Sequence, residues 1–143
     1  MNEYARSFLP ADVTKPNAPV VLEGVPESAV VARRYVRQTL REQVPDVGDS
    51  HLDDVVLVAS ELVSNAIRYG TEPGDSFALT VTADDVGTRV EVRDPIRRYP
   101  RRRPESSERQ RGRGLFILDA LCPQHWGSRD TPLGKTVWAE VPR

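Results

Sequence analysis

The residues best suited to chemistry in this 143-residue chain are Glu61 and Asn65, which stand four positions apart in a largely apolar stretch. At about 100° per residue, side chains four apart lie one above the other on the same face of a helix. A carboxylate stacked on a carboxamide beside a buried stripe can be a solvated helix face or part of a functional site. The other motifs of the chain distinguish these two interpretations.

Three further segments could contribute to the same site. Asp94 ends a segment of alternating apolar and polar residues, as expected for the last residue of a strand. Residues 112–114 read Gly-Arg-Gly and lead into an apolar, helix-like segment. Such a turn presents free N–H groups and the positive end of a helix dipole to an anion. Residues 134–136, Gly-Lys-Thr, lead into the last apolar segment. Taken singly, each of these segments also reads as an ordinary turn or loop exit.

A central helix must position the first pair. Its apolar residues recur at steps of three and four, the spacing of a buried helical stripe; they are Val55, Ala59, Leu62, Val63 and Ala66. Ser50 and Asp53 have the spacing of a capping box at its start. Gly70 stands where a glycine is expected to end a helix.

The remaining pattern predicts strands around residues 18–24, 77–82, 89–94, 126–129 and 136–141, a helix at 26–43 and a short helix from 115. Adjacent strands joined by tight turns favour a mixed, mostly antiparallel sheet. With the helices grouped on one face, the fold class is an α/β (α+β) two-layer sandwich. Pro19 predicts an edge position for the first strand.

The composition predicts a flexible segment at residues 1–17 and one domain at residues 18–143. Twenty Lys and Arg against 21 Asp and Glu give a formal net charge of −1, which does not favour nucleic acid or anionic membranes as partners. The single cysteine, Cys122, fits a reducing cytoplasm. No apolar run approaches the roughly 20 residues of a membrane span.

Four motifs in order resemble those of the GHKL, or Bergerat-fold, ATPases. Glu61-Leu-Val-Ser-Asn65-Ala is similar to the N box, and Val-Arg-Asp94 to the strand end that carries the adenine-binding aspartate. Gly112-Arg113-Gly114-Leu115 is similar to the second glycine box, and Gly134-Lys-Thr136 to the closing element. The resemblance covers residues 18–141. In size the chain is closest to the stand-alone anti-sigma-factor serine/threonine kinases.

The resemblance implies a histidine-kinase-like domain that binds ATP and Mg²⁺. Asn65 would ligate Mg²⁺, Glu61 would be the general base, and Asp94 would accept a hydrogen bond from the adenine amino group. The amides around the second glycine box, residues 112–115, would hold phosphate oxygens, and Thr136 would bind near the adenine. Residues 96–111 would form the lid.

The family also implies a sigma factor and a STAS-type anti-anti-sigma protein as partners. The second would be phosphorylated, and members of the family often dimerise.

One departure from the family's motifs favours an alternative to the kinase function. Asp94 is followed by Pro95, and no glycine occurs before Gly112, where the family's first glycine box continues Asp-x-Gly-x-Gly. The alternative is a non-catalytic regulator with weak or no ATP turnover. A third hypothesis is nucleic-acid binding through the arginine-rich segment 97–113.

Overall fold

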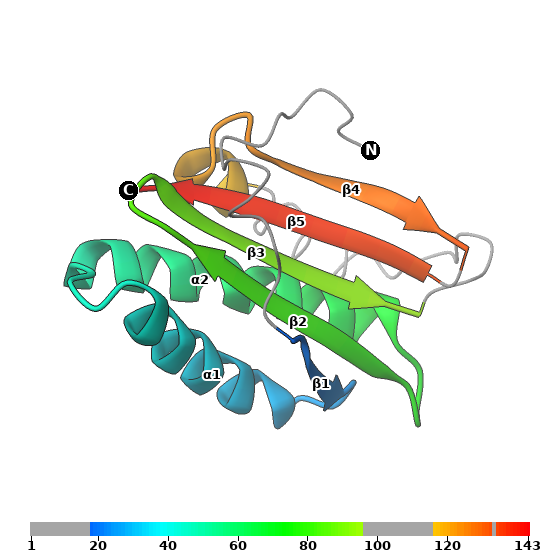
Figure 1. Ribbon diagram of the computed structural model, residues 1–143. Helices are drawn as coiled ribbons and strands as arrows, with labels where there is room; N and C mark the ends of the chain where they lie inside the picture. Colours follow the sequence, from blue (N-terminus) through cyan, green and yellow to red (C-terminus); the bar gives the residue numbers. More distant parts are fainter. Residues whose placement is uncertain (1–17, 96–115, 133) are drawn as a thin grey trace.

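Five strands form one sheet in the order β1-β2-β3-β5-β4 (Figure 1). The computed structural model describes residues 18–95, 116–132 and 134–143. Every pairing between the described strands is antiparallel, so the parallel pairs that a mixed sheet allows are not found among them. β1 lies at an edge, as Pro19 predicts. The strands are β1 (Val20–Glu23), β2 (Ser76–Ala83), β3 (Gly87–Asp94), β4 (Trp126–Thr131) and β5 (Gly134–Pro142).

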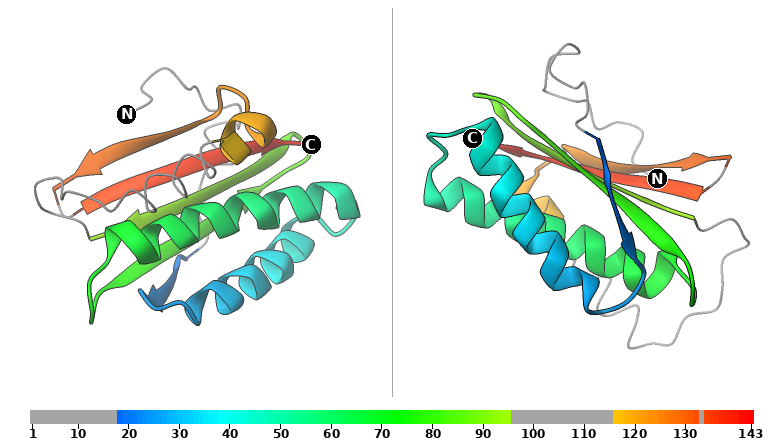
Figure 2. Two further views of the ribbon diagram at one scale, coloured as in Figure 1. Left: turned by 180° about the vertical axis from the view of Figure 1, so that it is seen from behind. Right: turned by 60° about the horizontal axis from the view of Figure 1, so that its bottom comes forward.

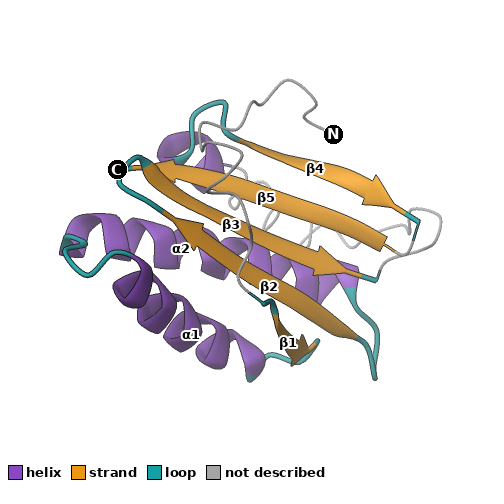
Figure 3. Ribbon diagram, in the orientation of Figure 1, coloured by secondary structure: helices purple, strands orange, loops and turns teal. Residues whose placement is uncertain are grey.

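The helices all cover one face of this sheet, which gives the two-layer sandwich that the sequence predicts. Helix α1 spans Ser28–Gln43, and α2 spans Asp49–Asn65 and continues into η1, Ala66–Gly70. Residues 116–121 are also helical. Figure 3 distinguishes the two layers, and both views in Figure 2 show α1 and α2 on the same side of the strands. None of the helices in the described part of the chain is long and apolar enough to cross a bilayer.

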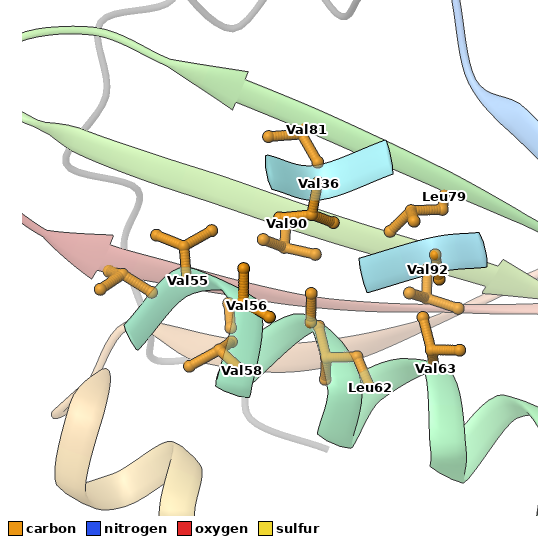
Figure 4. Close-up of a cluster of buried hydrophobic side chains, with 14 of the residues drawn as sticks. Val36, Val55, Val56, Val58, Leu62, Val63, Leu79, Val81, Val90 and Val92 are labelled. Carbon is orange, nitrogen blue, oxygen red and sulfur yellow. The ribbon is translucent and has the colours of Figure 1, made fainter. Parts of the chain in front are cut away.

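The core lies between these layers, where alternate strand residues meet the apolar stripe of α2 (Figure 4). Leu79 and Val81 of β2 and Val90 and Val92 of β3 are paired across the two strands and are almost fully buried. Facing them are the predicted stripe residues of the α2–η1 helix, all buried. Alternation with a period of two in the strands and spacing of three and four in the helix therefore build one apolar interface.

The two ends of the central helix differ from the sequence prediction. Helix α2 begins one residue before Ser50, its N-cap is Gly48, and no side chain caps it, so the predicted capping box is wrong. At the other end the helix widens into a π-helical turn, η1. Gly70 does not lie in the left-handed region; among the described glycines only Gly74 and Gly134 have positive φ. Gly70 therefore serves a purpose other than left-handed helix termination.

His51, in the first turn of α2, predicts a small acid dependence of stability. Its Nε2 lies 2.9 Å from Thr88 Oγ1, and burial, followed by the charge of Arg143, lowers the pKa of His51 below 6.5. The unfolded chain therefore takes up the proton first. The free energy of unfolding should fall as pH drops from about 6.5 through the lower folded-state pKa. Urea unfolding at pH 5 and at pH 7.5 gives the change in the free energy of unfolding between the two pH values. This change should be smaller for His51→Gln than for wild type. An equal change in the two proteins would show that His51 does not cause the acid dependence.

Candidate functional site

A pocket of about 100 Å³ opens between the C-terminal end of the α2–η1 helix and strands β3, β4 and β5. Most of its walls are apolar, and its polar side chains come from different elements. The pocket is lined by Leu62, Asn65, Ala66, Tyr69, Val92, Asp94, Leu118, Trp126, Ser128, Lys135 and Val137. Segments that are far apart in the sequence therefore meet here, as expected for a binding site.

The fold brings two of the predicted site residues together and separates two others from the pocket. Asn65 and Asp94 both line it. Glu61 is half-buried one helical turn before Asn65 and is not among the lining residues. Thr136 pairs with Arg93 and lies on the sheet face away from the helices, so the structure does not bring it to the pocket. Gly112, Arg113, Gly114 and Leu115, together with segments 1–17 and 96–111, lie outside the described residues.

Asp94 is a buried carboxylate whose position depends on two glycines. It ends β3 and is 3% exposed. A Cβ on Gly70 would overlap the carboxylate of Asp94, and a Cβ on Gly134 would overlap the Asp94 carbonyl oxygen. The end of η1 and the start of β5 can therefore approach Asp94 only because neither residue has a side chain. This close approach explains both glycines.

Lys135 is a charged pocket residue to which the sequence motifs assigned no role. It faces Asp94 across the β3–β5 ladder, and its Nζ lies 4.0 Å from Asp94 Oδ2. The alternation of residues along β5 could have predicted that Lys135 faces the pocket. Val137, Ala139 and Val141 occupy the helix-facing positions of that strand, and Lys135 continues their period, whereas Thr136 falls on the other face. The motif resemblance implies a role for Thr136 instead.

The chemistry of the lining suits a flat heterocycle that carries an amino group. An ionised carboxylate only accepts hydrogen bonds, so Asp94 fits an N–H donor. Apolar side chains such as Val92 and Val137, with the indole of Trp126, can cover the faces of a ring. That indole is itself oriented, because its Nε1 donates a 2.8 Å hydrogen bond to Asp119 Oδ1. The residues present therefore fit an adenine base.

A magnesium ion would fit here only in the company of phosphate oxygens. No group of three or more His, Cys, Asp or Glu side chains within the described ranges could hold a metal ion. Mg²⁺ commonly takes one or two protein oxygens and completes its shell with phosphates and water. The Asn65 carboxamide, on the helix side of the pocket, could supply one such oxygen.

The buried acceptor and the apolar lining of the pocket give this two-layer α/β domain features that suit nucleotide binding. The family model of the histidine kinase-like ATPase domain matches residues 22–141, and the chain belongs to that family. The predicted GHKL-type ATPase is thereby confirmed at the level of the family, and with it an ATP-binding, ATPase-like domain. No match was found among curated proteins.

Proposed function

We propose that this protein is an ATP-dependent regulatory kinase that phosphorylates a serine or threonine hydroxyl of a protein partner. The observation that supports it best is Asp94, a buried hydrogen-bond acceptor in a pocket that also contains Asn65. The family match supports ATP as the nucleotide. The resemblance of residues 18–141 to the anti-sigma-factor kinases supports a regulator whose substrate is another protein.

In this proposal each polar residue has a separate task. Asp94 accepts a hydrogen bond from the amino group of the base and so fixes the orientation of the nucleotide. The Asn65 carbonyl oxygen would ligate Mg²⁺, which would supply positive charge to the phosphates. Because Asn65 lies one turn after Glu61 on the same helix, a metal ligand and a proton acceptor are held at a fixed spacing.

Glu61 is proposed as the general base for phosphoryl transfer. The attacking hydroxyl oxygen forms a bond to the γ-phosphorus, the bond from that phosphorus to the bridging oxygen of ADP breaks, and the hydroxyl proton passes to the Glu61 carboxylate. Glu61 is half-buried and lies outside the pocket lining. That placement leaves it accessible to a hydroxyl supplied by a partner protein.

The partners proposed are a sigma factor, which is bound, and a STAS-type anti-anti-sigma protein, which is phosphorylated in the cytoplasm. The resemblance of residues 18–141 to the small anti-sigma kinases supports this choice. Homodimerisation is proposed on the same ground.

The general-base role predicts a kinetic effect without a binding effect. Glu61→Gln should slow phosphotransfer to a STAS-type substrate by about 10²- to 10⁴-fold, the usual contribution of a positioned base. Affinity for ATP, measured by calorimetry, should stay within about twofold because Glu61 does not line the pocket. Asp53→Asn, an exposed change on the same helix, is the matched control. Retention of full phosphotransfer by Glu61→Gln would exclude the general-base role.

A second candidate function is a non-catalytic regulator that binds its partner and holds ATP without turnover. The feature that favours it is Pro95, which directly follows Asp94 where the family's first glycine box has a flexible backbone. Thin-layer analysis of bound nucleotide after incubation with the partner distinguishes the two. Formation of ADP and phosphoprotein supports the kinase, whereas unchanged ATP in a stable complex supports the regulator.

A further inference from the structure

Lys135 places a positive donor beside the buried acceptor of the pocket. It lines the pocket with Asp94, and the two residues are register partners on β5 and β3. Its side chain is 24% exposed, whereas that of Asp94 is 2% exposed. An ammonium group has only donors and an ionised carboxylate only acceptors. A ligand that enters the pocket therefore meets an acceptor and a donor side by side.

The geometry leaves Lys135 able to bind a ligand. The distance of 4.0 Å between Lys135 Nζ and Asp94 Oδ2 is an ion-pair distance that exceeds the 2.7–3.2 Å of a protein N–H···O hydrogen bond. The ammonium thus compensates the buried charge of Asp94 through space without a direct hydrogen bond to it. Asp130, the register partner of Lys135 on β4, is exposed and lies at the rim of the same face.

An edge with a donor next to an acceptor complements this pair. Adenine has such edges, because its 6-amino group is flanked by two ring nitrogens, N1 and N7, that accept hydrogen bonds. If the amino group donates to Asp94, a ring nitrogen beside it comes close to the ammonium of Lys135. A base with a carbonyl at that position would instead place an acceptor against the carboxylate.

We propose that Lys135 is a specificity-determining residue of the pocket, which donates a hydrogen bond to the ring nitrogen beside the amino group bound by Asp94. This inference rests on the proposed function, because it takes the ligand to be an adenine nucleotide. It assigns to Lys135 the recognition that the sequence motif assigned to Thr136. It also makes recognition of the base depend on a charged donor at one position and a charged acceptor at the next.

Calorimetric titration of wild type and Lys135→Met with ATP, 1-deaza-ATP and 7-deaza-ATP tests this assignment. Methionine keeps an unbranched chain of similar length and removes the donor. Lys135→Met should bind ATP about 10- to 100-fold more weakly, the range for a hydrogen bond to a charged group. The deaza analogue that lacks the accepted nitrogen should bind wild type more weakly by a similar factor, and Lys135→Met should weaken it no further. Lys135→Arg, which keeps a donor, should recover part of the loss.

Arg129→Met, which removes a charge from the other face of the neighbouring strand β4, is the matched control. Circular dichroism shows whether each variant is folded. ATP binding by Lys135→Met that is as tight as wild type, or tighter, overturns the inference and leaves the proposed function standing. An equal loss for all three nucleotides also overturns it, since the charge would then act on the phosphates. No ATP binding by the wild-type protein overturns the proposed function and this inference with it.

Discussion

Gly70→Ala is expected to abolish measurable ATP binding and to lower the free energy of unfolding. The added Cβ would overlap the Oδ2 and Cγ atoms of Asp94, so either the carboxylate or the end of η1 must move. Both are packed at the edge of the core, and overpacking of this kind costs about 1–3 kcal/mol. Displacement of the acceptor removes the group that orients the base. Urea unfolding and calorimetric titration with ATP measure the two effects.

Gly48→Ala is the matched control for this change. A Cβ on Gly48 would meet no atom within 4 Å, and its φ is −76°. It should therefore keep both its stability, within about 1 kcal/mol, and its affinity for ATP. If Gly70→Ala proved as stable as wild type and bound ATP equally well, the close packing of η1 against Asp94 would not be needed for binding.

Asp94→Asn is expected to weaken ATP binding about 100-fold with little change in stability. The substitution keeps the shape of the side chain but removes its charge and replaces one acceptor oxygen by a donor. Hydrogen bonds to charged groups are about twice as strong as neutral ones. Stability should hold, because burying a neutral amide costs less than burying an ionised carboxylate. Asp94→Asn should therefore lose ATP affinity alone, whereas Gly70→Ala should lose both ATP affinity and stability.

The titration that measures Asp94→Asn needs an acidic residue outside the pocket for comparison. Asp85→Asn serves, since the Asp85 side chain is fully exposed in the β2–β3 turn. Its ATP affinity should equal that of wild type. Equal affinity of Asp94→Asn and wild type would show that Asp94 is a structural residue at the end of β3 and that the base is bound elsewhere.

Much of the fold could be predicted from the sequence because its patterns are local. The stripe on α2 and the alternation in β2 and β3 reflect the two repeat lengths of helix and strand, and the structure confirms both. The structure also places Asn65 and Asp94 in the lining of one pocket. Both residues reach this pocket because α2 packs on β3, the strand whose last residue is Asp94.

Features that depend on tertiary contact could not be predicted in this way. The π-helical turn η1 and the true reason for Gly70 appear only when the helix end packs against Asp94. Glu140 is another case. It is completely buried on the outer face of the sheet, where its Oε1 accepts a 2.6 Å hydrogen bond from Arg89 Nη1, and Arg89 lies over the ring of Trp138. Alternation alone predicts a solvated carboxylate there.

Titration of the wild-type protein with ATP and Mg²⁺ by calorimetry is the most direct test that this pocket is an ATP site. Saturable binding with a stoichiometry near one per chain, which is weakened about 100-fold by Asp94→Asn, is the predicted result. Absence of heat at millimolar ATP, or binding that Asp94→Asn leaves intact, would contradict it.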